Sequence, residues 1–261
     1  TMSNAQNVPE LLNALTDLVR EAGAVVMAVY ATDFHVRGKD DASPVTEADE
    51  RAEAVIVAGL ARLTPDIPVV AEEAVAAGKT PDVGERFWLV DPLDGTKEFI
   101  SRNGEFTVNI ALVERGVPVL GVVLAPALGA QGRLYAGAAG HGAWLDDGQG
   151  RRAIACRAVP AEGLTVVASR SHGDAAALDA FLAGRKVAST TNAGSSLKLC
   201  LVAAGDADLY PRLGRTMEWD IAAGHAVLLA AGGAVRRVSD GMPLTYGKPG
   251  FDNPHFAASG Q

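Results

Sequence analysis

The sequence predicts a layered sandwich of helices and sheets, of the α/β or α+β class. Two observations carry this expectation. Apolar residues recur every three or four positions over residues 9–30, which is the period of an amphipathic helix. Short apolar runs bounded by turn residues form hairpins in the first half and alternate with helical patterns in the second, and such elements pack in layers. With 261 residues, 48% of them hydrophobic, the chain is long enough to bury a large core.

The first part of the chain is expected to hold two helices and two strands. The helix over residues 9–30 has Pro9 in its first turn. A second helix is expected from Ala48 to Leu63, because Thr46 and Asp49 have the spacing of a capping box. Two apolar strands follow, "IPVVAEE" and "RFWLVD", and both end in acidic residues. A further helix is expected to begin at "TKEF".

The remainder divides into a hairpin region and a layered region. Residues 106–129 hold two strands around an "ERG" turn, and residues 132–148 continue the sheet with glycine-rich breaks. After about residue 150, strands alternate with helices. Because no linker or repeat separates the two halves, we expect two subdomains in one chain, residues 2–150 with the metal-binding acids and residues 151–261 completing the substrate site.

The composition argues against several classes of function. A net charge of −8 disfavours nucleic-acid polymers as partners, since proteins bind them chiefly through clustered Lys and Arg. No apolar run approaches the roughly 20 residues that cross a bilayer, and the polar start does not resemble a signal peptide. We therefore expect a soluble cytoplasmic protein. If it binds a phosphate ester, divalent cations held by carboxylates would supply the missing positive charge.

The stretch "WLVDPLDGTKEF" places Asp91 and Asp94 three positions apart, where like charges repel. Asp, Pro and Gly all favour turns, so a plain strand-to-helix turn is one interpretation. A metal site is the other. Pro92 keeps Asp91 out of helical geometry, and the amides of Gly95 and Thr96 begin the following helix, where they can hold a phosphate. The apolar strand that runs straight into this turn favours the functional interpretation.

Further acids end or begin other elements. Glu72 and Glu73 end the strand "VVAEE", and Asp220 stands at the head of an apolar helix. Taken singly, the two glutamates could be solvated acids at a strand end, and Asp220 could be a helix N-cap. Taken together with "DPLDGT", these acids provide the all-oxygen site that Mg²⁺ prefers. The absence of a cluster of His and Cys argues against zinc.

Asp49 also has two interpretations. As part of a capping box, it would only satisfy the start of its helix. As a carboxylate near the metal site, it would accept a proton from a Thr hydroxyl and so orient an attacking water. The spacing alone leaves both open.

The combination of "SPVTEAD" (43–49), "AEE" (71–73), "WLVDPLDGT" (88–96), "GSS" (194–196) and "EWDIAAGHAVLLAAGG" (218–233) resembles the inositol monophosphatase family of metal-dependent, lithium-sensitive phosphatases. The resemblance covers most of the chain and implies an αβαβα sandwich. It also implies that Asp49 and Thr96 prepare the attacking water. Its metal ligands, for two or three Mg²⁺ ions, correspond to Glu72, Asp91, the Leu93 carbonyl, Asp94 and Asp220.

Within the family, residues 91–126 look like the 3'(2'),5'-bisphosphate nucleotidase branch. The inositol branch usually has "TN" where this chain has Lys97 and Glu98, and tends to have an acid in place of Arg212. "ASRSH" and "GSSLK" resemble substrate-binding segments of the nucleotidases. The resemblance thus implies phosphate or nucleotide contacts from Gly95, Thr96, Ser169, His172, Ser195, Lys198 and Asp220.

Three of these residues also have structural explanations. His172 could be an exposed loop residue, Lys198 a solvated helix position, and Ser195 a helix cap. No residue that stacks on a base can be named from the sequence.

The sequence therefore predicts a Mg²⁺-dependent phosphomonoesterase that hydrolyses 3'-phosphoadenosine 5'-phosphate to AMP and phosphate. Its partner would be this small nucleotide, and the chain would be a monomer or homodimer. One alternative is inositol monophosphatase or fructose-1,6-bisphosphatase activity, because one fold serves several phosphate esters. Another is a catalytically silent regulator that binds phosphate or metal, against which the intact acids and Thr96 argue.

Overall fold

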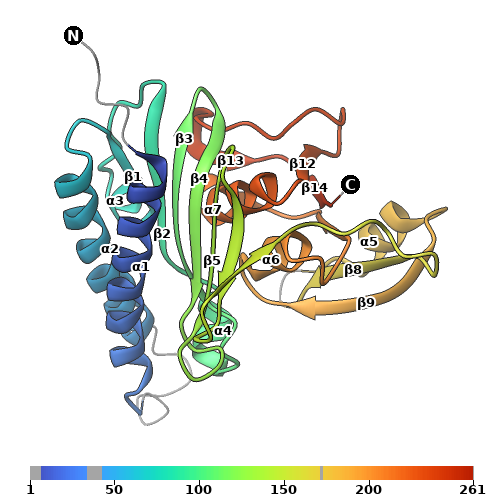
Figure 1. Ribbon diagram of the computed structural model, residues 1–261, viewed down its shortest axis with the longest axis horizontal. Coiled ribbons are helices and arrows are strands. Elements are labelled where there is room, and N and C mark those ends of the chain that lie inside the picture. Colours follow the sequence, from blue (N-terminus) through green and yellow to red (C-terminus); the bar gives the residue numbers. More distant parts are fainter. Residues whose placement is uncertain (1–6, 34–42, 171–172, 261) are drawn as a thin grey trace.

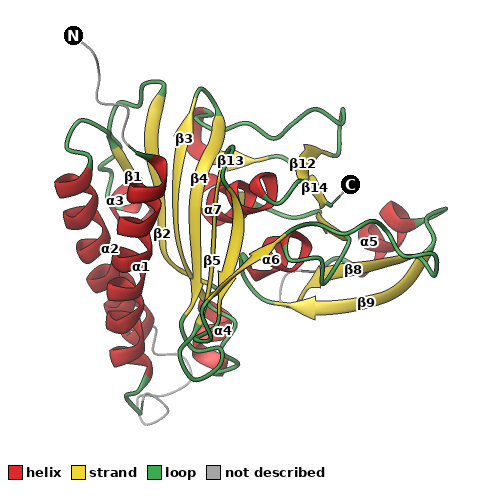
Figure 2. Cartoon of the chain, viewed as in Figure 1, coloured by secondary structure: helices red, strands yellow, loops and turns green. Residues whose placement is uncertain are grey.

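The computed structural model describes residues 7–33, 43–170 and 173–260. Helices and sheets alternate across the molecule, as Figures 1 and 2 show. The layers are, in order, α1 (Val8–Tyr30) with α2 (Ser43–Leu63), a seven-stranded sheet, α6 (Leu197–Ala203) with α7 (Glu218–Ala230), a five-stranded sheet, and α5 (Ala175–Leu182). The predicted layered sandwich is confirmed. Within the described ranges, no helix is long and apolar enough to cross a membrane.

The seven-stranded sheet carries the large core of the first half. Its strands lie in sequence order, and all neighbours are antiparallel except β1 and β2. They are β1 (Val69–Ala71), β2 (Arg86–Asp94), β3 (Thr107–Glu114), β4 (Val117–Ala125), β5 (Arg133–Ala138), β6 (Gly142–Asp146) and β7 (Arg151–Ile154). Strands β2 to β4 are almost entirely buried, because α1 and α2 pack on one face and α7 on the other. This explains why these strands read as continuous apolar runs.

The five-stranded sheet has the order β12-β14-β10-β8-β9. Strands β8 (Leu164–Ser169), β9 (Val187–Ala193) and β10 (Leu209–Arg212) run parallel, while β14 (Phe256–Ser259) is antiparallel to β10 and β12 (Ala234–Arg237). Because β8, β9 and β10 are parallel, their carboxyl ends meet at one edge of the sheet. In such sheets that edge is where ligands bind.

Short elements complete the fold around this edge. Helix α3 (Glu72–Ala76) follows β1, and helix α4 (Thr96–Ser101) follows β2, as "TKEF" predicts. Strands β11 (Thr216–Met217) and β13 (Asp252–Asn253) pair with each other, and the 3-10 helix η2 (Pro249–Phe251) precedes β13.

Helix α2 begins earlier than the sequence pattern predicts. It starts at Ser43 rather than Ala48, with Pro44 in its first turn. Proline is well tolerated there, because the first N–H groups of a helix have no partner within the helix. Thr46 and Asp49 therefore lie inside the helix, and the predicted capping box is wrong. The Ser-Pro pair was the better start signal.

Strand β2 also differs from the prediction. It continues past Asp91 to Asp94, with a shift of register between the two residues where it pairs with β3. Such a bulge redirects side chains at the end of a strand, and here it lies between Asp91 and Asp94. The division of the chain near residue 150 stays a prediction about folding units.

Candidate active site

Three acids from both halves of the chain meet at the edge between the two sheets. Asp91 and Asp94 come from the bulged end of β2, and Asp220 comes from the first turn of α7. One carboxylate oxygen of each lies within 4.8 Å of the others. Oxygens at this spacing could hold a divalent cation.

The local backbone orients these carboxylates. Asp91 Oδ1 accepts a hydrogen bond from the Leu93 amide (3.1 Å), and Asp94 Oδ2 accepts one from the Ser196 amide (2.8 Å). Asp220 Oδ2 accepts one from the Met217 amide (2.8 Å), which precedes α7. Asp220, the third residue of α7, thus accepts a hydrogen bond from the amide of the N-cap residue Met217. Its carboxylate also lies close to those of Asp91 and Asp94.

Glu72 joins these acids to form what we call the acid cluster, Glu72, Asp91, Asp94 and Asp220. Burial raises the pKa of Asp91 well above its usual range, and Glu72, Asp94 and Asp220 raise it further. Burial and then Asp220 raise the pKa of Asp94 to about 8, although the Lys198 ammonium opposes the shift. Burial raises the pKa of Glu72 to about 7. Crowded, buried carboxylates repel one another, and a divalent cation between them would offset this repulsion, so the cluster fits such a cation.

Helix α3 is held at its start by an acid that sequence reasoning missed. Glu53, on α2, accepts the Glu73 amide through Oε1 (2.8 Å) and the Ala74 amide through Oε2 (3.1 Å). It therefore fixes the turn that carries Glu72. A glutamate on the buried side of an otherwise amphipathic helix was the available signal, since Glu53 is only 8% exposed.

Asp49 lies in the second turn of α2 and is buried. Its Oδ1 atom has no hydrogen-bond partner within the described part of the chain. Burial, followed by the negative charge of Glu72, raises the pKa of Asp49 to about 8. A buried carboxyl with an unpartnered oxygen fits a proton acceptor better than a helix cap.

A cavity of ≈ 390 Å³ opens beside the acid cluster. It is lined by the acid cluster and by most of the other predicted site residues, namely Leu93, Gly95, Thr96, Ser169, Ser195 and Lys198. His172 lies outside the described residues. The structure therefore brings together segments that are up to 148 residues apart, from Glu72 to Asp220.

Lys198 and Ser195 do not match their structural explanations. Lys198 is only 3% exposed, so it is not a solvated helix position. Its Nζ donates to the Ala193 carbonyl (3.3 Å) and lies 5.3 Å from the centre of the Tyr210 ring, and burial lowers its pKa to about 8. Ser195 does not cap α6, because Ser196 occupies the N-cap position. The hydroxyl of Ser195 donates instead to a backbone carbonyl in the loop between α4 and β3.

Arg212 is a second cation in the cavity. The sequence marks it only as a branch difference, yet it ends β10 at the edge of the sheet and lines the cavity. Its Nη2 donates to the Arg215 carbonyl (3.3 Å), and its buried Nε has no hydrogen-bond partner within the described residues. Two buried cations thus face the acid cluster, and this arrangement suits an anionic ligand.

Comparisons with known proteins identify the family of this chain. The model of the inositol monophosphatase family matches residues 7–258. The 3'(2'),5'-bisphosphate nucleotidase CysQ of Escherichia coli O157:H7 is 49% identical over 252 residues, which cover 95% of this chain and 99% of that protein. The 3'(2'),5'-bisphosphate nucleotidase CysQ of Buchnera aphidicola is 40% identical over an alignment that covers 96% of this chain and 94% of that protein. The crystal structure of CysQ from Bacteroides thetaiotaomicron superposes with a TM-score of 0.82 over 98% of this chain and 99% of that protein, and the two sequences are 38% identical.

Proposed function

Because this chain belongs to the inositol monophosphatase family, we propose that it is a Mg²⁺-dependent 3'(2'),5'-bisphosphate nucleotidase that hydrolyses 3'-phosphoadenosine 5'-phosphate to AMP and phosphate. The names of its relatives support the substrate class. The observation that carries the proposal is the cavity itself. It combines an acid cluster with the buried cations Lys198 and Arg212, so one substrate can present one phosphate to each.

The acid cluster and the Leu93 carbonyl would hold two or three Mg²⁺ ions. The fit rests on the crowding of these carboxylates, because burial and then the neighbouring acids raise the pKa values of Asp91, Asp94 and Glu72. Bound there, the ions would polarise the phosphoryl oxygens and stabilise the negative charge on the leaving 3'-oxygen.

The chain's own residues position the phosphate and the water. Gly95 has a φ of 92°, which favours glycine, and lets the backbone turn so that the amides of Gly95 and Thr96 can hold phosphate oxygens. The Thr96 hydroxyl orients the attacking water, and Asp49 accepts a proton from that hydroxyl.

The other end of the cavity recognises the nucleotide. Lys198 and Arg212 would bind the 5'-phosphate, because each is a buried cation that gains a charge-assisted hydrogen bond. Ser169, Ser195 and His172 would contact the rest of the nucleotide. The state of assembly, monomer or homodimer, and the cytoplasmic location stay predictions from the sequence.

A panel of substrates tests the assignment. We expect kcat/KM with Mg²⁺ to be highest for 3'-phosphoadenosine 5'-phosphate, lower for 3'-AMP, and much lower for inositol 1-phosphate and fructose 1,6-bisphosphate. A preference for inositol 1-phosphate would move the protein to the inositol branch. No phosphate release from any of the four would favour the silent regulator.

A further inference from the structure

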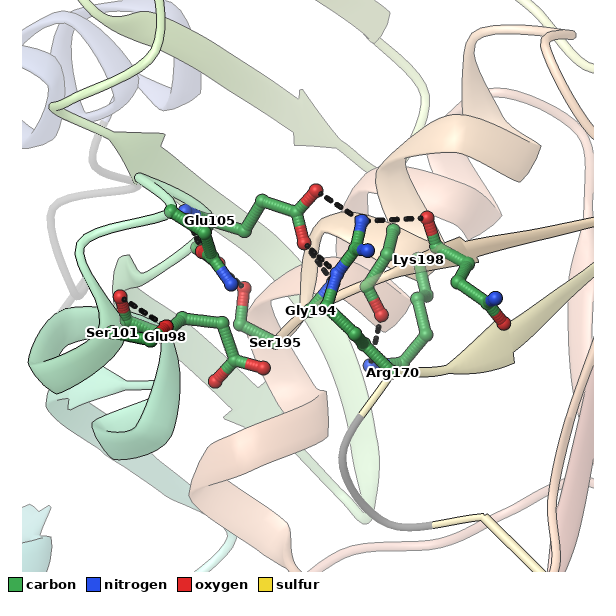
Figure 3. Close-up of polar contacts among 10 residues, drawn as sticks. Glu98, Ser101, Glu105, Arg170, Gly194, Ser195 and Lys198 are labelled. Atoms are coloured by element: carbon green, nitrogen blue, oxygen red, sulfur yellow. Dashed lines mark hydrogen bonds and ion pairs between the residues drawn. The ribbon is translucent and has the colours of Figure 1, made fainter.

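Glu105 connects the two sheets beside Ser195, which lines the active-site cavity (Figure 3). It lies in the loop between α4 and β3, and its carboxylate reaches the ends of β8 and β9 in the other sheet. Oε2 accepts hydrogen bonds from Arg170 Nε (3.1 Å) and from the Gly194 amide (2.8 Å), and Oε1 accepts one from Arg170 Nη2 (2.9 Å). The backbone carbonyl of Glu105 accepts one from the Ser195 hydroxyl (2.6 Å). We call this set of contacts the Glu105 clasp.

Arg170 connects the clasp to both strand ends. It directly follows β8, and its Nη2 also donates to the carbonyl of Asn192 in β9 (3.2 Å). Figure 3 shows its guanidinium between the Glu105 carboxylate and this carbonyl. The pairing is bidentate, which fixes direction as well as distance. Because the Arg170 and Glu105 side chains are 45% and 20% exposed, water weakens the ion pair, so we expect its effect on overall stability to be small.

The clasp holds the residues next to the proposed nucleotide contacts. Ser169 directly precedes Arg170, and Ser195 directly follows Gly194, and both serines line the cavity. Ser195 has a φ of 52°, a backbone conformation that non-glycine residues rarely adopt without outside restraint. Its hydrogen bond to Glu105 supplies that restraint.

The strand end is also seated closely against α4. A Cβ atom at Gly194 would lie 2.5 Å from Glu98 Cγ, so any side chain at this position would force the Glu98 side chain of α4 to move. Helix α4 begins at Thr96, next to the amides proposed to hold the reacting phosphate. The clasp thus sets the distance between the nucleotide end and the phosphate end of the cavity.

We propose that Glu105 is a positioning residue that sets nucleotide specificity by holding the ends of β8 and β9 in register with the phosphate-binding turn. This inference rests on the proposed function. A bisphosphate must touch both ends of the cavity at once, and a displacement of about 1 Å between them can cost roughly a hundredfold in rate. A small phosphate ester bound only at the acid cluster does not need the clasp.

The experiment compares Glu105→Gln, Arg170→Gln and the double variant with Glu85→Gln. Glu85 directly precedes β2 and forms an exposed ion pair with Arg115, which directly follows β3, at the end of these strands away from the acid cluster. Glu85→Gln therefore controls for the loss of a paired surface carboxylate. Steady-state kinetics would be measured with 3'-phosphoadenosine 5'-phosphate and with glycerol 2-phosphate. Mg²⁺ affinity would be measured by calorimetry.

We expect Glu105→Gln to lower kcat/KM for the nucleotide by roughly ten- to a hundredfold, because a displaced nucleotide end no longer holds the 3'-phosphate in its reacting position. Values of kcat/KM for glycerol 2-phosphate and the Kd for Mg²⁺ should stay within about twofold of wild type. The double variant should be no worse than the more impaired single variant, because the two side chains act as one unit. Arg170→Lys should recover part of the loss, since it restores charge but not the bidentate geometry.

Equal losses of kcat/KM for the nucleotide and glycerol 2-phosphate, or a weakened Mg²⁺ affinity, would overturn the proposal. Glu105 would then support the structure of the whole site rather than nucleotide specificity. A nucleotide kcat/KM that matches that of Glu85→Gln would overturn it as well. If Glu105→Gln does not fold, Arg170→Gln and Arg170→Lys carry the same comparison. A wild-type protein that does not prefer the nucleotide over glycerol 2-phosphate would instead refute the proposed function, and this result is obtained before any variant is measured.

Discussion

At the scale of single residues, Asp94 connects the two ends of the cavity. Its carboxylate belongs to the acid cluster, accepts the Ser196 amide, and interacts with the charge of Lys198. The sequence could identify Asp94 because it follows an apolar strand in a turn rich in Pro and Gly. It marked Arg212 only through the family resemblance, and it could not place Glu53 in the site, because the partners of Glu53 come from a distant segment and Glu53 stands in no motif of its own.

Asp94→Asn should abolish Mg²⁺-dependent turnover and leave the protein folded. A neutral amide binds a hard cation poorly, while its oxygen can still accept the Ser196 amide. Replacement of one crowded, buried carboxyl by a neutral amide should leave the metal-free protein at least as stable as wild type, because the amide cannot ionise. Activity would be measured by phosphate release and stability by thermal unfolding in EDTA. Retention of more than about a tenth of the rate, a loss below about 1.4 kcal/mol, would contradict a metal role for Asp94.

Lys198→Ala should damage recognition rather than chemistry. Loss of a charged hydrogen bond costs roughly 1.5 to 3 kcal/mol, or about ten- to a hundred-and-fiftyfold in kcat/KM. We expect this loss for 3'-phosphoadenosine 5'-phosphate, a smaller loss for 3'-AMP, which lacks the 5'-phosphate, and almost none for inositol 1-phosphate.

Thr96→Ala provides the matched comparison for Lys198→Ala. A hydroxyl that orients the attacking water serves every substrate, so its removal should lower kcat for all three. If Lys198→Ala lowers kcat/KM equally for all three substrates, Lys198 supports the structure of the site rather than recognising the 5'-phosphate. Its hydrogen bond to the Ala193 carbonyl would then explain this structural role.

At the scale of elements, the site depends on short helices whose starts are fixed from outside. Helix α3 has only five residues, and none of them is buried, so it has little packing of its own to hold it. The two bonds to Glu53 supply its main restraint at the start. The sequence located Glu72 at the end of a strand but gave no sign of this restraint, since Glu53 resembles any other acid in a helix.

Glu53→Ala should weaken Mg²⁺ binding although it removes no proposed ligand. The freed amides of Glu73 and Ala74 would release the turn that carries Glu72, and loss of such supporting partners typically costs about ten- to a hundredfold in metal affinity. Glu53→Gln keeps one acceptor and should have a smaller effect. Glu47→Ala, in an exposed ion pair on the same helix, is the control. Calorimetric titration with Mg²⁺ gives the Kd of each variant, which should be highest for Glu53→Ala, intermediate for Glu53→Gln and unchanged for Glu47→Ala. A wild-type Kd for Glu53→Ala would refute the proposed supporting role of Glu53.

At the scale of the whole molecule, the site exists only because two sheets meet at one edge. The layered class could be predicted, because apolar runs and amphipathic helices follow each other along the chain. The meeting of β2 with the ends of β8, β9 and β10 could not, because strand order and direction depend on tertiary packing. The Glu105 clasp shows the same limit, since Glu105 and Arg170 lie 65 residues apart in the sequence.

The acid cluster should also make the stability of the whole metal-free protein depend on pH. In the folded state the pKa of Asp49 and of Asp94 is about 8, and that of Glu72 is about 7, whereas unfolded carboxyls titrate near pH 4. Between these values the folded state binds more protons than the unfolded state. The stabilising contribution of these groups is therefore complete below about pH 4 and is lost as the pH rises to about 8.

The clearest window for this measurement is about pH 6.5 to 8. Below it, His225 opposes the trend, because its folded pKa is lowered to about 3 and the unfolded imidazole takes up protons. Above it, Lys198 opposes the trend, because its folded pKa is about 8. In EDTA we expect the melting temperature to fall across this window, and Asp94→Asn should show a shallower fall.

Saturating Mg²⁺ should remove most of this dependence, because the cation replaces the protons that the acids would otherwise hold. At a Mg²⁺ concentration of about 100 times Kd, the gain is about 2.7 kcal/mol, or roughly 5 to 10 °C for a chain of this size. The difference between melting temperatures with Mg²⁺ and with EDTA should therefore widen from pH 6.5 to 8. A difference that stays constant from pH 6.5 to 8 would mean that the carboxyls are already ionised in the metal-free protein, and would contradict proton displacement by Mg²⁺ at the acid cluster.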